Sequence, residues 1–186
     1  MTMTMLTPGS ARAIEFQKAM VFIDGTNLFF RLETQRLKLF TIDSICRHFA
    51  GGRDIIRIYL YTSQPYYDKA VEAHGKDLFR NVRVVFGDAV PLGNGNYKEK
   101  GVDALLVADL VYHAASRNFD FAMLMSADTD FARALKRVED FGCRTAVISL
   151  GSGTPNLLKQ ACDKVIEINE ETLITNKWAE RVKAVI

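Results

Sequence analysis

The chain has 186 residues, of which 48% are hydrophobic and 25% charged, and its formal net charge is +2. This length suits one domain with a substantial core, and so small a charge gives no argument of its own for a nucleic-acid partner. No apolar run reaches the roughly 18–20 residues that span a bilayer. The three cysteines form no zinc motif, so we expect reduced thiols in a cytoplasmic protein with no membrane association.

The first 17 residues, MTMTMLTPGSARAIEFQ, are repetitive, small and polar. They lack a charged region followed by an apolar one, so they do not resemble a secretory signal. We expect residues 1–17 to be a disordered or vector-derived extension and residues 18–186 to form a single domain.

After this extension, short β-branched or aromatic runs alternate with longer helical patterns. The predicted elements in chain order are a strand at 19–24, a helix at 42–50, a strand at 54–62, a helix at 65–80, a strand at 82–90, a loop at 91–99, a helix at 101–117, a strand at 119–126, a helix at 128–142, a strand at 143–150, a short helix at 154–162, a sixth strand at 163–168 and a helical end. Such alternation predicts a parallel sheet with helices on both faces.

Acidic residues follow two of the most apolar strands, at the edge where parallel sheets bind ligands. Asp24 ends the first strand, and Asp128 and Asp130 follow the fourth. Asp103 begins the helix at 101–117, on the side predicted to face the sheet. Clustered carboxylates repel one another, and a divalent cation offsets this repulsion. Because Mg²⁺ and Mn²⁺ prefer oxygen ligands, three such acids favour a shared metal site.

Each acid also has a structural interpretation that the sequence leaves open. Asp24 could open a turn with Gly25 and cap the next helix, and Asp128 suits the same role. Asp103 and Asp130 would then favour the positive ends of helices.

Neighbouring polar residues could support either arrangement. The amide of Asn27 could tie the Asp24 loop to the loop after the fourth strand, or hold a metal-bound water. Ser126 or Thr129 could donate a hydrogen bond to a carboxylate or to a phosphate.

Three motifs, VFIDGTNLFFRL, KEKGVDALLVADLVYHA and LMSADTDFARALKRVEDFGCRTAVI, resemble the NYN domain family in its LabA-like branch, which is related to PIN-domain nucleases. The resemblance covers about residues 18–168. It implies a PIN-like three-layer α/β/α sandwich with a mainly parallel sheet in the strand order 3-2-1-4-5, which the strand at 163–168 would extend.

The resemblance also implies Mg²⁺- or Mn²⁺-dependent ribonuclease activity. The family's acids fall on Asp24, Asp103 and Asp128, with Asp130 as a less constant fourth, and its asparagine and serine fall on Asn27 and Ser126. Many PIN-like nucleases carry another acid near the end of the second strand. That strand here ends in Tyr61-Thr62-Ser63, which leaves the number of metals open.

The resulting hypothesis is a metal-dependent ribonuclease that hydrolyses phosphodiester bonds. Asp24, Asp103 and Asp128 would hold the metal, and Asp130 and Asn27 would complete the catalytic set. A non-catalytic RNA-binding or protein-interaction adaptor and a metal-dependent phosphohydrolase are the alternatives. The motif Asp-Gly-Thr disfavours a DxD phosphatase, which needs a second aspartate two residues after the first.

The expected partner is single-stranded RNA, and a homodimer is left open. Tyr66, just past a strand end, could stack on a base. Lys100 could contact a phosphate, although a solvated loop lysine is the usual outcome. Arg36 and Lys38 could also contact phosphates, with solvated faces as the default.

Overall fold

The computed structural model describes residues 17–93 and 96–182. The strands are β1 (Lys18–Asp24), β2 (Leu37–Leu39), β3 (Asp54–Ser63), β4 (Arg83–Pro91), β5 (Tyr97–Lys100), β6 (Phe121–Met125), β7 (Arg144–Leu150), β8 (Lys164–Ile168) and β9 (Ala179–Arg181). The helices are α1 (Gly25–Thr34), α2 (Ile42–Ala50), α3 (Gln64–His74), α4 (Val102–Ala115), α5 (Ala132–Asp140), α6 (Asn156–Lys159) and α7 (Glu170–Thr175), with 3₁₀ turns η1 (Lys76–Phe79) and η2 (Thr129–Phe131).

The main sheet has the order β5-β4-β3-β1-β6-β7-β8 within the described residues. All neighbouring pairs from β4 to β8 are parallel, and only β5 pairs antiparallel, with β4. The predicted order 3-2-1-4-5, extended by a sixth strand, corresponds to β4-β3-β1-β6-β7-β8 and is confirmed. Because β1 and β6 are neighbours, the residues that follow them meet at one edge of the sheet.

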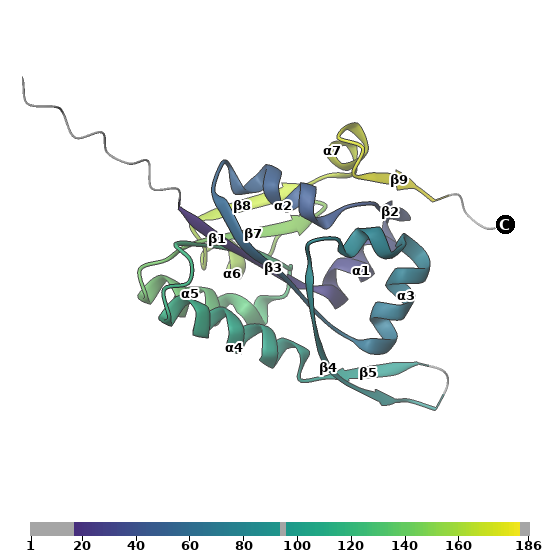
Figure 1. Cartoon of the computed structure of the whole chain (residues 1–186), viewed down its shortest axis with the longest axis horizontal. Helices are drawn as coiled ribbons and strands as arrows, with labels where there is room; N and C mark the ends of the chain where they lie inside the picture. The colour runs from purple at the N-terminus through teal and green to yellow at the C-terminus, as the bar shows by residue number, and fades with distance from the viewer. Residues whose placement is uncertain (1–16, 94–95, 183–186) are drawn as a thin grey trace, which may run out of the picture.

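Helices cover both faces of this sheet and form three layers (Figure 1). On one face, α1, α2 and α3 pack over alternate residues of β1 such as Val21 and Ile23. On the other face, α4 and α5 pack over Met20 and Phe22. All four of these β1 side chains are buried, as expected for a central parallel strand.

The segment at 91–99 differs from its prediction as a loop. Pro91 ends β4, and Tyr97–Lys100 forms β5, so the two strands make an antiparallel hairpin at the sheet's edge (Figure 1). Within β5, half-buried and exposed residues alternate. A strand of four residues is too short for this alternation to be recognised in the sequence. The Asn-Gly pair between the two strands is nevertheless a sequence signal for a hairpin. Residues 94 and 95 lie outside the described residues.

The C-terminal end also differs from the prediction of a helix. After the short α7, β9 pairs antiparallel with β2, a strand that the sequence pattern did not indicate. Both strands have three residues, and a strand of that length carries too little alternation to recognise. The first 16 residues of the predicted extension, and residues 183–186, lie outside the described residues.

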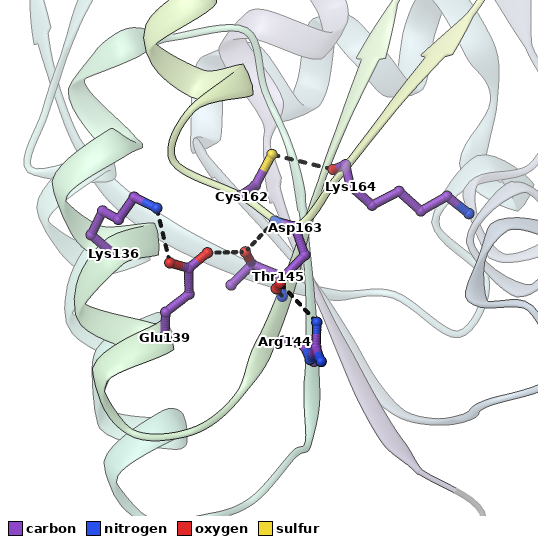
Figure 2. A network of polar contacts seen from close by, with 7 residues as sticks. All are labelled: Lys136, Glu139, Arg144, Thr145, Cys162, Asp163 and Lys164. Carbon is purple, nitrogen blue, oxygen red and sulfur yellow. Dashed lines mark hydrogen bonds and ion pairs between the residues drawn. The ribbon is translucent and has the colours of Figure 1, made fainter.

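A polar network joins α5 to the starts of β7 and β8 (Figure 2). The Thr145 hydroxyl donates to Glu139 at 3.2 Å, and the Asp163 carboxylate accepts from the Thr145 backbone N–H at 2.8 Å and pairs with Arg144 at 3.0 Å. Lys136 pairs with Glu139 on the outer side of α5. These contacts lie at the amino ends of the parallel strands, so they fix the sheet at the end opposite Asp24.

In the part of the chain that the structure describes, no helix combines the length and the apolar character needed to cross a membrane.

Candidate functional site

The carboxylate of Asp24 is fixed where β1 turns into α1. Asp24 is the N-cap of α1, and its Oδ1 accepts a hydrogen bond from the backbone N–H of Asn27 at 3.0 Å. The next residue must be glycine, because a Cβ on Gly25 would lie 2.7 Å from the backbone oxygen of Tyr61. The Asp-Gly pair therefore lets α1 begin directly against β3 and holds the acid at the strand's tip.

Hydrogen bonds connect this turn to the loop after β6. The Ser126 hydroxyl donates to Asp24 Oδ2 at 2.8 Å and accepts from the Asp128 backbone N–H at 3.0 Å. The Ala127 backbone N–H donates to the Asn27 side-chain oxygen at 3.2 Å. Of the roles considered for these residues, Asn27 ties the two loops together and Ser126 bonds to a carboxylate.

Asp103 reaches the same region from α4. Gly101 precedes this helix in the left-handed conformation, with φ of 76°, which favours glycine. Leu106 and Leu110 are fully buried against the sheet, whereas Asp103 is exposed in the first turn. Asp109, further along α4, accepts a hydrogen bond from the Tyr61 hydroxyl at 2.9 Å.

Asp24, Asp103 and Asp128 line one pocket of about 360 Å³. Asn27 and Glu99 line it as well. The structural roles considered for the three acids coexist with this placement, since Asp24 and Asp128 cap α1 and η2 while their carboxylates border the pocket.

The pocket raises the pKa values of two of its acids, Asp24 and Asp103. Burial raises the pKa of Asp24 to about 6, and repulsion from Asp103 and Asp128 adds to this rise, while hydrogen bonds from Asn27 and Ser126 oppose it. Partial burial, followed by repulsion from Asp128 and other acids, raises the pKa of Asp103. The carboxylates therefore lie close enough to disfavour one another's charge.

The donor set fits a hard divalent cation. Each oxygen of Asp24 accepts one hydrogen bond, which leaves a lone pair on each for a ligand bond. Oxygen donors of this kind suit Mg²⁺ or Mn²⁺. Among residues 17–93 and 96–182, however, no three His, Cys, Asp or Glu side chains form a ready-made metal-binding group. The assignment of Asp24, Asp103 and Asp128 as ligands therefore stays a prediction.

Glu99 is a residue of this pocket that the sequence analysis missed. Its Oε1 accepts from the Ser63 backbone N–H at 2.6 Å and from the Thr62 hydroxyl at 3.3 Å, and its Oε2 accepts from the Thr26 hydroxyl. The β4–β5 hairpin thus brings a carboxylate to the end of β3, where the sequence shows no acid. Recognising the hairpin would have placed Glu99 beside Asp103.

The remaining candidates lie around the pocket. Asp130 is exposed, and its backbone N–H donates to Asp128 Oδ1 at 2.9 Å. Thr129 is half-buried in η2, and Lys100 is exposed at the end of β5. The hydroxyl of Tyr66 donates to the backbone oxygen of Tyr97 at 3.1 Å, and the ring lines an adjoining groove. None of these four residues lines the acidic pocket itself.

Among the known proteins that are similar to this chain, one is a sequence relative and one is a solved structure. A protein of Sinorhizobium fredii (strain NBRC 101917 / NGR234), described as uncharacterized protein y4oD, is 32% identical over 72 residues. That match spans 37% of this chain and 34% of the relative, about a third of its length. The structure of VPA0982 from Vibrio parahaemolyticus RIMD 2210633, a protein of unknown function, superposes with a TM-score of 0.64. It covers 86% of this chain and 98% of its own at 16% identity, which shows a shared fold.

The sequence matches the NYN domain over residues 18–169. This range runs from the start of β1 to just past β8, so it contains the whole parallel sheet and the acidic pocket at its edge. The chain belongs to the NYN domain family.

Proposed function

We propose that this protein is a metal-dependent ribonuclease that hydrolyses phosphodiester bonds of single-stranded RNA. The NYN domain belongs to the PIN-like nuclease superfamily, which supports a nuclease as the broad class. The observation that carries the proposal is the buried carboxylate of Asp24, which lines the same pocket as Asp103 and Asp128.

Hydrolysis of a phosphodiester needs an activated water and neutralisation of charge on the phosphate. A bound Mg²⁺ or Mn²⁺ would supply both, by lowering the pKa of a water and polarising the phosphate. Asp24, Asp103 and Asp128 would hold this cation. Asn27 and Ser126 hold Asp24 in one orientation, so its carboxylate needs little rearrangement before the reaction.

Asp103 differs from Asp24 in being exposed at the rim of the pocket. Although its side chain is exposed, partial loss of hydration in the pocket and repulsion from neighbouring acids raise the pKa of Asp103, which makes it a better proton acceptor for a water than an isolated aspartate. We assign it to the metal or to the orientation of that water.

The purified protein should cleave single-stranded RNA with Mn²⁺ or Mg²⁺, and EDTA should abolish cleavage, because the clustered carboxylates would repel the phosphate unless a cation lay between them. The assay compares a panel of RNAs with single-stranded DNA and a generic phosphomonoester. Metal-dependent turnover of the phosphomonoester without RNA cleavage would support the phosphohydrolase alternative. RNA binding without cleavage under any metal would support a non-catalytic adaptor.

Substitutions of Glu99 should show whether its hydrogen bonds to the neighbouring segments or its negative charge is needed for cleavage. Two donors already occupy Oε1, so Glu99 is expected to hold the hairpin against β3 and α1 rather than to bind metal. Glu99→Gln keeps acceptors for the Ser63 N–H and should retain cleavage within about fivefold, whereas Glu99→Ala leaves that N–H unpaired and should lower the rate about tenfold or more.

The cleavage rate and the melting temperature of both variants are measured side by side. A loss with Glu99→Gln as large as with Glu99→Ala would show that the negative charge itself is needed, which makes Glu99 a further acid of the metal site.

A further inference from the structure

A second and larger cavity, of about 900 Å³, lies between α1 and α3. We call it the α1–α3 groove. Figure 1 shows the two helices side by side on one face of the sheet. Thr26 and Phe30 of α1 line both this groove and the acidic pocket. These residues are four apart and share one face of the helix, so the groove continues directly from the acidic pocket along α1.

Aromatic side chains line the groove, Phe30 from α1 and Tyr66 from α3 among them. Phe30 is 66% exposed, although it is a large apolar side chain on a helix whose other face is buried. Tyr66 is half-buried on α3, and its hydroxyl is anchored to the backbone oxygen of Tyr97. An anchored ring and an exposed ring on opposite walls are suited to stacking on flat, apolar surfaces.

The charge of the groove is opposite to that of the pocket beside it. Arg36, Lys38 and Lys69 line the groove, with Glu33 as the one acid among its lining residues. The Lys69 ammonium lies 5.5 Å from the centre of the Tyr66 ring. Arg36 is exposed. The Lys38 ammonium forms an ion pair with the Glu180 carboxylate at 3.8 Å. These cations line the same groove as the aromatic rings, so they could bind an anionic group next to a ring stacked there.

Single-stranded RNA has this combination of groups, because each nucleotide adds one base and one phosphate. We propose that the α1–α3 groove binds the nucleotides on one side of the phosphate held at the acidic pocket. In this arrangement, bases stack on Phe30 and Tyr66. Lys69 and Arg36 contact the phosphates that link the stacked nucleotides.

This inference rests on the proposed function, since it takes the acidic pocket as the place of cleavage. It also predicts a preference for single strands. Bases in a duplex are stacked and paired inside the helix, so they cannot lie on Phe30 or Tyr66 without unpairing. The groove therefore selects unpaired RNA, while the acidic pocket acts on the backbone without regard to sequence.

The test measures binding without cleavage. A fluorescein-labelled oligouridylate of 12 nucleotides is titrated with the full chain in EDTA, and fluorescence anisotropy gives Kd. Phe30→Ala should raise Kd about 5- to 150-fold, the range for loss of one stacked base. Lys69→Ala should weaken binding and lower the slope of log Kd against log salt by about 0.7, as for loss of one phosphate contact.

Two matched variants serve as controls. Tyr112 on α4 is 63% exposed, close to the value for Phe30, but lines neither cavity. Lys136, labelled in Figure 2, is an exposed lysine of α5. It is not among the residues that line either cavity. Tyr112→Ala and Lys136→Ala should bind the oligonucleotide as the wild type does. Melting temperatures show that each variant is folded; Phe30→Tyr, which keeps a ring, should restore binding.

The outcomes separate the groove from the catalytic proposal. Wild-type affinity in both Phe30→Ala and Lys69→Ala, or equally tight binding of a duplex RNA, would overturn the groove even if metal-dependent cleavage is found. Absence of RNA binding by the wild type would also overturn the proposal that the groove binds RNA. A protein or peptide would then be the partner to test. Loss of binding in the variants without cleavage by any form would support the groove and refute the nuclease.

Discussion

Replacing Asp24 with asparagine should lower the rate of RNA cleavage by about a hundredfold or more, the loss typical of removing one electrostatic group at a reaction centre. The substitution changes little volume. Asparagine can still accept the backbone N–H of Asn27, and its amide can donate to the Ser126 hydroxyl, which has a second lone pair. The expected loss therefore comes from the missing charge and not from a missing helix cap.

Binding of RNA in EDTA should survive in Asp24→Asn or become tighter, because an anionic strand loses one repulsive neighbour. Asp130→Asn is the matched control, since Asp130 is exposed and lies outside the pocket. The rate of RNA cleavage by Asp130→Asn should fall by about tenfold at most, because Asp130 would act only by influencing another acid. Equal metal-dependent rates for Asp24→Asn and the wild type would assign the activity to a contaminant or to another site.

The position of Asp24 could be predicted because its causes are local. Parallel strands buried on both faces must be apolar throughout, so a carboxylate directly after such a run marks the strand's carboxyl end. The same reasoning placed Asp128 after β6, and helical periodicity placed Asp103 at the start of α4. The alternation of strands and helices then predicted the parallel sheet, and the family resemblance predicted the order that makes β1 and β6 neighbours.

Features that depend on contacts between distant segments were not predictable. Glu99 reaches Ser63 across 36 residues of chain, through a hairpin whose strand β5 has four residues. Phe30 is an ordinary apolar helix residue in the sequence, and only the structure shows that it is exposed and lines the groove between α1 and α3. The role proposed for Lys69 depends on its place on the other wall of the same groove.

Gly25, the glycine of the Asp-Gly pair, also combines a local feature that the sequence predicts with a distant contact that it does not. In the sequence, Gly25 fits a turn, which any exposed loop could contain. In the structure, its missing Cβ leaves room for the backbone oxygen of Tyr61 on the neighbouring strand. A tertiary contact, which no local pattern encodes, therefore explains why glycine follows the acid.

Burial of Asp24 should make the metal-free protein less stable at neutral pH than Asp24→Asn. Folding raises the pKa of this carboxyl from 3.8 to about 6, mainly by burial. The protonated form therefore favours the folded state below pH 3.8, and this contribution is lost as the pH rises through about 6. Since one pKa unit corresponds to about 1.4 kcal/mol, the charged carboxylate costs about 3 kcal/mol at pH 8.

Melting temperatures of the wild type and Asp24→Asn, measured in EDTA from pH 4 to pH 8, should differ little at pH 4. Above pH 7 the variant should be more stable by about 1–3 kcal/mol, with about 2–4 °C for each kcal/mol in a chain of this size. Added Mg²⁺ should then narrow the gap, because a cation that binds only the folded wild type stabilises it by mass action. A variant that is less stable at every pH would show instead that the helix-cap role of Asp24 outweighs its burial, since loss of a cap costs about 0.5–2 kcal/mol without regard to this pKa.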